Sequence, residues 1–150
     1  MKFWAIFLAT FGGVGYCPVA PGTAATAAGI VVALICQGSL FLYSAVTAVL
    51  FVVGVPACTY MEKLLGVKDP GMACIDEVVG VLIALWNLPL TWPVLISRFF
   101  LFRALDMFKI YPINRLEAIS GGMGIMLDDV MAGLYKNIIL RLALGYAGIF

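Results

Sequence analysis

Apolar residues form long, nearly unbroken runs along this chain, and short polar or proline-containing breaks separate them. Two runs cover residues 22–36 and 40–58, with the turn-forming Gln37-Gly38-Ser39 between them. Helices over these runs would be about 22 and 28 Å long, so the second nearly crosses a bilayer core of ~30 Å. The pattern predicts an antiparallel helical hairpin that brings Thr23 to the same side as residues 60–75.

The second half of the chain predicts three more helices, over residues 78–88, 94–110 and 125–150. Prolines and tryptophans within 86–93 indicate a turn at a membrane surface after the first of them. A glycine-rich loop, residues 113–124, precedes the last helix. We therefore expect an all-α fold: a multi-pass integral membrane helical bundle with short and broken helices, forming a single domain over residues 1–150.

Composition supports a membrane protein. The chain is 64% hydrophobic, and it has no charged residue between Lys2 and Glu62. So apolar a chain of this size could not cover a soluble domain with polar groups. Its first residues lack a clear cleavage site, so we expect a retained N-terminus rather than a signal peptide. The net charge of +1 excludes a strongly basic nucleic-acid binder. Four cysteines without C-x-x-C spacing are interpreted as small buried hydrophobes.

Acidic residues are rare and grouped. Of eight in the chain, five form the groups Asp76-Glu77, Asp106 and Asp128-Asp129, each within apolar sequence. Two carboxylates about 4 Å apart repel by roughly 4 kcal/mol at an effective dielectric of 20. Adjacent acids in an apolar chain therefore need a proton, a basic partner or a metal cation. Because the chain has no His, carboxylate ligands favour Mg²⁺ over zinc, and His-dependent phosphatase chemistry is excluded.

Each group also has a structural interpretation. Acids stabilise a helix N-terminus, which accounts for one of Asp76 and Glu77 but poorly for both. Arg103, Asp106 and Lys109 lie at i, i+3 and i+6, so the Asp can pair with both cations. Alone this spacing favours a buried ion pair, whereas the surplus positive charge suits a phosphate.

The predicted threading places the candidate residues at one membrane face. Glycines at 121, 122 and 124 beside it permit a tight turn and close approach of the backbone to an anion. The same face is expected to receive the basic residues Lys63, Lys68, Arg115 and Lys136. The positive-inside rule then predicts that this face is cytoplasmic.

Three ordered blocks of sequence resemble the phosphatidylglycerophosphatase A family of bacterial membrane lipid phosphatases. They are GYCPVAPGT at 15–23, DPG at 69–71 followed by IDEVVG at 75–80, and FRALDMFK at 102–109 continuing through GGMGIMLDDVMAG at 121–133. The resemblance implies an all-helical fold and Mg²⁺-dependent hydrolysis of phosphatidylglycerophosphate to phosphatidylglycerol and phosphate. It places the activity at the cytoplasmic face of the inner membrane. Ile110 and Ala24-Ala25 depart from the family's usual residues, which concerns loop geometry more than chemistry.

The candidate residues take three kinds of role. Catalytic roles are predicted for Asp76, Glu77, Asp106, Asp128 and Asp129. Mg²⁺ ligands are predicted among Asp69, Asp76, Glu77, Asp128 and Asp129. Contacts to the substrate phosphate are predicted for Thr23, Arg103 and Lys109. The division of roles among the carboxylates stays open, as does the choice between a phospho-aspartyl intermediate and direct attack by water.

Two other classes of function compete with this interpretation. Paired acids could carry ions or protons across the bilayer in a transporter, but a transporter should distribute them along a path through the membrane. A structural subunit could use buried ion pairs for assembly, but it would not need two adjacent-acid pairs.

Overall fold

The computed structural model describes residues 2–92, 94–96 and 119–146, and over these residues it is helical with no β-strand. Its elements are α1 (Lys2–Ala9), the 3-10 turn η1 (Val14–Tyr16), α2 (Pro21–Cys36), α3 (Leu40–Leu65), α4 (Ile75–Leu85) and α7 (Gly122–Tyr146). The all-α prediction is confirmed for this part of the chain. The predicted helix over 94–110 lies outside the described residues except for its first three positions.

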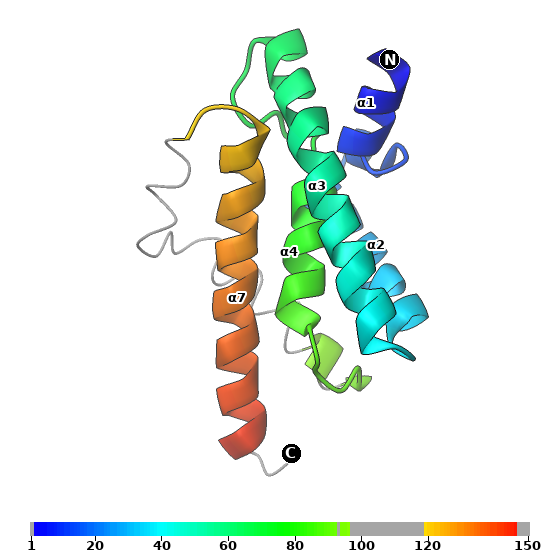
Figure 1. Ribbon diagram of the computed structural model, residues 1–150, viewed down its shortest axis with the longest axis vertical. Coiled ribbons are helices and arrows are strands. Elements are labelled where there is room, and N and C mark those ends of the chain that lie inside the picture. The colour runs from blue at the N-terminus through cyan, green and yellow to red at the C-terminus, as the bar shows by residue number, and fades with distance from the viewer. Residues whose placement is uncertain (1, 93, 97–118, 147–150) are drawn as a thin grey trace.

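Helices α2 and α3 form the predicted antiparallel hairpin (Figure 1). Pro21 opens α2 at the first helical position, where its missing N–H costs nothing. Ser39 caps α3, its hydroxyl oxygen accepting a hydrogen bond from the Leu42 N–H at 3.3 Å. The break at residues 37–39 therefore lies where the sequence predicted it.

The predicted end of α3 at residue 58 is wrong, because the helix continues to Leu65. The residues after Cys58 include good helix formers, and Pro56 does not end the helix. Termination comes at Gly66, which has φ +65° and donates its N–H to the Glu62 carbonyl at 2.9 Å. A glycine in this left-handed conformation is a common helix C-cap.

Helix α3 is the one described helix that is long and apolar enough to cross a membrane. Its 26 residues reach about 39 Å. Only 17% of its most apolar window is buried within the protein, which distinguishes it from the core helix of a soluble protein. The shorter apolar helix α2 has 16 residues. The coarser expectation, an apolar helical protein with a helix that can span a bilayer, is therefore met.

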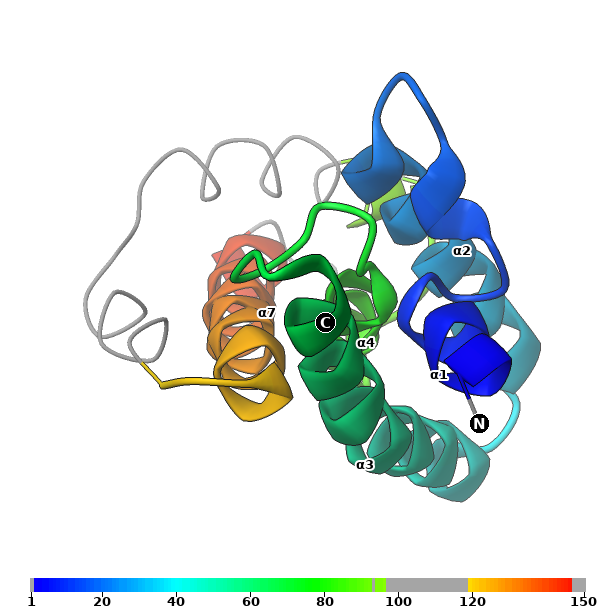
Figure 2. The ribbon, with the colours of Figure 1, turned by 90° about the horizontal axis from the view of Figure 1, so that it is seen from above.

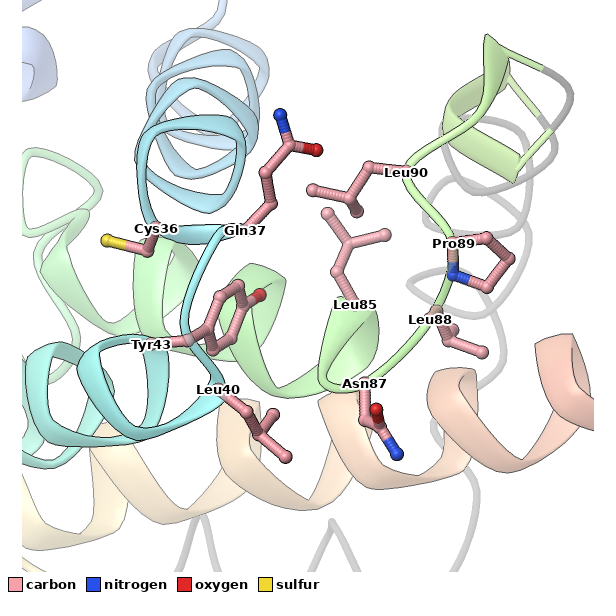
Figure 3. Close-up of a pocket in the computed structure, with 9 residues that line it drawn as sticks. All are labelled: Cys36, Gln37, Leu40, Tyr43, Leu85, Asn87, Leu88, Pro89 and Leu90. Carbon is pink, nitrogen blue, oxygen red and sulfur yellow. The ribbon is translucent and has the colours of Figure 1, made fainter.

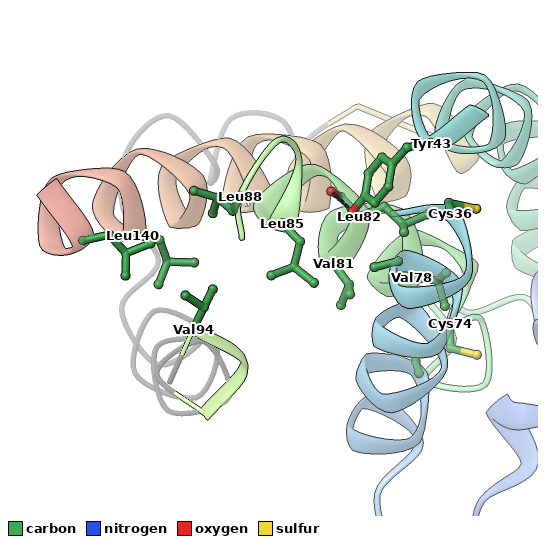
Figure 4. Packing of buried hydrophobic residues seen from close by; sticks show 13 residues of the cluster. Cys36, Tyr43, Cys74, Val78, Val81, Leu82, Leu85, Leu88, Val94 and Leu140 are labelled. Carbon is green, nitrogen blue, oxygen red and sulfur yellow. Dashed lines mark hydrogen bonds between the residues drawn. The ribbon is translucent and has the colours of Figure 1, made fainter. Parts of the chain in front are cut away.

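Helix α4 lies at the centre, between α2, α3 and α7 (Figure 2). Nine of its eleven residues are buried, as expected of a helix that is apolar on all sides. Its side chains pack against α2 and α3 in the largest core cluster, where the Tyr43 hydroxyl donates to the Leu82 carbonyl at 2.7 Å (Figure 4).

Helix α7 satisfies the C-terminal end of α4. The side-chain amide of Asn137 donates to the carbonyls of Ala84 and Trp86, each at 3.0 Å. Arg141 Nε donates to Asn137 Oδ1 at 2.8 Å, and its Nη2 donates to the carbonyls of Trp86 and Asn87 at 3.0 and 3.2 Å. These side chains pair carbonyls that a helix end leaves unsatisfied, and the Arg charge suits the negative end of the helix dipole.

Helix α7 begins at Gly122, three residues earlier than predicted, because it packs directly on α3. The Gly122 N–H donates to Thr59 Oγ1 at 2.8 Å. A Cβ at Gly122 would overlap the Val55 carbonyl oxygen. The hypothesis that this glycine admits an anion is wrong, since its N–H and its open side both face α3.

Candidate active site at one end of the bundle

All five acids predicted as metal ligands lie at one end of the helix bundle. Asp69 is in the loop 66–74, Asp76 and Glu77 are in the first turn of α4, and Asp128 and Asp129 are in the second turn of α7. The C-terminal end of α3 and the N-terminal ends of α4 and α7 meet at the top of Figure 1. Figure 2 looks onto this end and shows the loop passing beside α7 before it enters α4.

Asp76 is the buried member of the group. Its side chain is 6% exposed, and its Oδ1 has no hydrogen-bond partner among the residues the structure describes. Burial raises the pKa of Asp76 well above its usual range, and the nearby charges of Asp129, Glu77 and Asp69 raise it further. The backbone N–H of Glu77 only partly opposes these effects. The carboxylates are therefore close enough to repel one another.

Asp69 and Asp128 line one cavity of about 230 Å³, together with Lys68. Asp69 has φ +50°, a left-handed conformation that is uncommon outside glycine but tolerated by Asp. Strained backbone of this kind clusters at functional sites. The cavity joins the loop 66–74 to α7, so it brings together two acids that are 59 positions apart in the sequence. Sequence reasoning missed Lys68 as a site residue and used it only for membrane orientation.

Glu77 lies against the start of α2. A Cβ at Gly22 would stand 2.8 and 2.9 Å from the two carboxylate oxygens of Glu77. Only glycine allows this approach, which puts the carboxylate at the positive end of the α2 dipole. Thr23, predicted to contact the substrate phosphate, follows directly in the first turn of α2. The hairpin thus brings Thr23 to the acidic end of the bundle, as predicted.

Asp129 lies near enough to Asp76 to affect its charge because α4 and α7 cross closely. A Cβ at Gly80 would stand 3.0 Å from the Asp129 carbonyl oxygen and 3.3 Å from its Cβ. One helical turn further, a Cβ at Gly133 would stand 2.6 Å from the Gly80 carbonyl oxygen. Two glycines at one crossing let the helix backbones touch, which sets the position of the acid on α7 relative to the acid on α4.

The carboxylates of the cluster are suitable ligands for a hard divalent cation, although their present positions do not form a complete coordination site. Among the described residues, no three acids or cysteines already stand in the arrangement that holds a metal ion. The feature that fits a cation is the buried Oδ1 of Asp76, which lacks a hydrogen-bond partner in the described part of the chain and has three further carboxylates nearby. Carboxylate oxygens are the ligands that Mg²⁺ prefers.

Comparison with known proteins agrees with the sequence motifs. The family model for phosphatidylglycerophosphatase A matches residues 7–144. A phosphatidylglycerophosphatase A from Escherichia coli K12 is 36% identical over 91% of this chain and 81% of its own length. Its counterpart from Haemophilus influenzae is 36% identical over 85% of the chain and 81% of its own length. The chain belongs to the phosphatidylglycerophosphatase A family.

A relative from Bacteroides thetaiotaomicron has a different name. This protein, "Putative phosphatidylinositol-3-phosphatase", is 34% identical over 95% of this chain and 94% of its own length. No solved structure matches this one. All of these names describe removal of a phosphate group from a lipid by hydrolysis of a phosphate monoester. Membership of the family places this chain among lipid phosphatases.

The first motif block of the family, residues 15–23, has a structural task in this chain. A Cβ at Gly15 would overlap the Met72 carbonyl oxygen, so the block packs on the loop that carries Asp69. The same loop is held by the N–H of Cys74, which donates to the Ala9 carbonyl at 2.9 Å. The block therefore positions the acid-bearing loop at Gly15 and contacts Glu77 at Gly22.

Cys74 is not suited to act as the nucleophile of this phosphatase family member. It is buried, and its thiol donates to the Thr10 carbonyl at 3.3 Å. Burial, followed by the charges of Glu77 and Asp76, raises the pKa of the Cys74 thiol to about 12. A thiol that stays protonated at neutral pH is a poor nucleophile.

Only part of the third motif block lies among the described residues. Arg103, Asp106 and Lys109, predicted to support catalysis and hold the phosphate, lie outside the described residues, as does Arg115. Lys136 was expected at the acidic end, and that prediction is wrong. It is 5% exposed and lies eight residues beyond Asp128, about 12 Å further along α7.

The cavity of Figure 3 lies at the opposite end of the bundle. Its volume is about 330 Å³, and it is formed where the turn after α2 meets the segment after α4. The described residues that line it include Gln37, Tyr43 and Asn87, and none of them is acidic or basic. These described residues supply no charge that could neutralise a phosphate, whereas the five acids described above lie at the other end of the bundle.

Proposed function

We propose that this protein hydrolyses the terminal phosphate monoester of phosphatidylglycerophosphate. In the overall reaction the bond from phosphorus to the glycerol oxygen breaks, water supplies a hydroxyl to phosphorus and a proton to the glycerol oxygen, and phosphatidylglycerol and inorganic phosphate are released. The observation that carries the proposal is the convergence of acids from the loop 66–74, α4 and α7 at one end of an apolar bundle. Family membership supports the same substrate.

Mg²⁺ is the cofactor that this acid cluster favours. When bound, it would neutralise phosphate oxygens and lower the pKa of a bound water. Asp76, which is buried and lacks a described partner for Oδ1, would hold the ion from inside the bundle with Glu77 and Asp129. Asp69 and Asp128 line the open cavity and would meet the ion from the substrate side.

Basic side chains would complete the phosphate site. Lys68 lines the same cavity as Asp69 and Asp128, so it can meet a phosphate that enters there. Arg103 and Lys109 remain our predicted phosphate ligands from the third motif block. Arg suits this role because its guanidinium can donate two parallel hydrogen bonds to phosphate oxygens.

We further propose that the protein is a multi-pass protein of the bacterial inner membrane, with the acidic end at the cytoplasmic face. Helix α3 supports this because it is long, apolar and mostly unburied. Exposed Lys63 and Lys68 lie near its C-terminal end and follow the positive-inside rule. A lipid phosphate group at that surface would be level with the acids.

The transporter alternative is not favoured. A transporter should have acidic residues spread along a path through the bilayer. The acidic residues in the described part of this chain instead gather at one end of the helices. The family comparisons also name phosphatases.

A substrate panel tests the proposal. Phosphate release is measured with the detergent-solubilised protein and with three lipids: phosphatidylglycerophosphate, phosphatidic acid and phosphatidylinositol 3-phosphate. We expect phosphatidylglycerophosphate to be hydrolysed with the highest kcat/KM, and Asp128→Asn to remove the activity. Preference for phosphatidylinositol 3-phosphate would contradict the assigned substrate, and no release from any of the lipids would contradict the function.

A further inference from the structure

An apolar groove of about 470 Å³ runs along the side of the bundle and is not used by the proposed chemistry. Its lining residues come from α3, α4 and α7 and from the segment at the end of α4, and α4 lies between the other two helices in Figure 1. Six apolar residues supply much of its lining: Phe51, Val52, Val79, Ile83, Val130 and Leu134. Its volume falls within the range of about 300–1,000 Å³ typical of ligand sites.

The groove begins where the acid cluster ends. Val130 directly follows Asp129 in α7, and Val79 is two residues after Glu77 in α4. From Val79 the groove follows α4 to Trp86, a distance of about 10 Å along the helix. A molecule with a phosphate at the acids and an apolar tail can therefore occupy both places at once.

The walls of the groove carry exposed apolar residues, which would face the lipid bilayer. Val52 and Leu134, one on each wall, are exposed large apolar residues. Helix α3, which forms one wall, is the helix able to span a membrane. The groove therefore opens toward the bilayer in the proposed arrangement, and none of the described residues that line it is charged.

We propose that this groove binds an acyl chain of the lipid substrate and thereby orients the phosphate toward the acids. The proposal rests on the proposed function, because the lipid phosphate supplies the group that the acids recognise. It assigns the groove a part in selecting a lipid phosphate over a water-soluble phosphate monoester with the same headgroup.

Filling the groove tests this assignment. Ala48 lines the groove on α3, and Ala48→Phe places a ring in it. Val49→Phe is the matched control, since Val49 is 60% exposed and does not line the groove. For each variant, kcat/KM is measured for dioleoyl phosphatidylglycerophosphate and for its deacylated, water-soluble headgroup. The readout is the ratio of the two values.

We expect the ratio of lipid to headgroup kcat/KM to fall about tenfold in Ala48→Phe, a typical effect of altered fit in an apolar pocket. The ratio should be unchanged in Val49→Phe. An unchanged ratio in Ala48→Phe would overturn the proposal. This outcome includes the case in which the groove is instead a contact between two copies of the protein, so that the variant changes their association but not the ratio. Should Ala48→Phe fail to fold, Leu134→Trp on the opposite wall repeats the test, with Ile138→Trp as its control.

A binding measurement separates failure of the groove from failure of the proposed function. A phosphatidylglycerophosphate with a photoreactive diazirine in its acyl chain is crosslinked to the unmodified protein, and the labelled residues are found by mass spectrometry. We expect labels on residues 44–52 and 130–134, and loss of these labels in Ala48→Phe. Labels confined to other faces would overturn the groove assignment even if the phosphatase is active, whereas labelled groove residues in an inactive protein would contradict only the function.

Discussion

At the scale of single residues, Asp76 combines a buried carboxylate with three acidic neighbours. Asp76→Asn keeps the shape of the side chain but removes the charge that a cation needs. We expect its turnover to fall by about 10²–10³-fold, the usual cost of losing one electrostatic group in an active site. Glu62→Gln is the control, because Glu62 on α3 is not among the acids whose charges act on Asp76. Near-normal turnover of Asp76→Asn at saturating Mg²⁺ would contradict a role in catalysis and would favour the interpretation that Asp76 only stabilises the N-terminus of α4.

The same variant has a signature in stability that does not depend on activity. In chelator, the folded protein holds a proton on Asp76 more tightly than the unfolded chain, in which the pKa is about 3.9. The stabilising effect of that proton is full below the unfolded pKa and is lost as pH rises through the higher folded pKa. The thermal midpoint of the metal-free protein should therefore fall with rising pH, and it should fall less in Asp76→Asn. An identical pH dependence in both proteins would contradict the burial of this charge.

Gly22 allows a second residue-level test. Gly22→Ala adds a Cβ within 2.8 Å of a Glu77 carboxylate oxygen, so the carboxylate must move. We expect kcat/KM to fall by at least tenfold. The protein should stay folded, because replacing Gly by Ala in a helix favours the helix by at most about 0.5–1 kcal/mol. Gly38→Ala is the matched control, because nothing lies within 4 Å of its added Cβ. Equal activity of the two variants would show that the position of Glu77 is unimportant.

At the scale of helices, the crossing of α4 and α7 sets the geometry of the site. Gly133→Ala would place a Cβ 2.6 Å from the Gly80 carbonyl oxygen and 3.2 Å from the Ile83 Cβ. Because backbone cannot yield as a side chain tip does, we expect a loss of about 1–3 kcal/mol in stability. The thermal midpoint in detergent should drop, and turnover should fall with it. Gly145→Ala, also in α7 but with nothing within 4 Å, should change neither.

The hydrophobic pattern predicted much of this architecture. It gave the α2–α3 hairpin and its turn, and the gathering of acids at one end. It also gave a helix after the loop 66–74, which was predicted over 78–88 and extends over Ile75–Leu85 in the structure. It missed the last seven residues of α3, because the prediction ended the helix where the apolar run ends. In the structure the helix ends at Gly66, which adopts a left-handed C-cap conformation. It also missed the start of α7, where the Gly122 N–H donates to Thr59 Oγ1 on α3, a contact that no local pattern indicates.

Contacts between distant segments explain the other omissions. Asn137 and Arg141 cap α4 from another helix, and no local pattern marks that role. Lys68 became a site residue only when the loop 66–74 met α7 across a cavity. The motif blocks named acids that the fold brings to one end of the bundle. The close contacts of Gly15 and Gly22 depend instead on how the folded segments approach one another. The roles of Arg103, Asp106 and Lys109 stay predictions.

At the scale of the whole molecule, the membrane orientation can be tested through α3. Gly71→Cys lies in the acid-bearing loop and Gly38→Cys lies before α3, and both sites have open space around them. With the half-buried Cys17 replaced by Ala, a membrane-impermeant thiol reagent should label Gly71→Cys only from the cytoplasmic side. Gly38→Cys should react only from the opposite side. Labelling of both from one side would show that α3 does not cross the bilayer.

The central claim is that a cluster of carboxylates binds Mg²⁺ to hydrolyse a lipid phosphate. Phosphate release from phosphatidylglycerophosphate by the detergent-solubilised protein is measured with Mg²⁺, in excess chelator, and after Mg²⁺ is restored. We predict release with Mg²⁺, its loss in chelator, and its recovery on addition of the metal, because the acids need a cation before an anionic phosphate can approach them. Full release in excess chelator would contradict the claim.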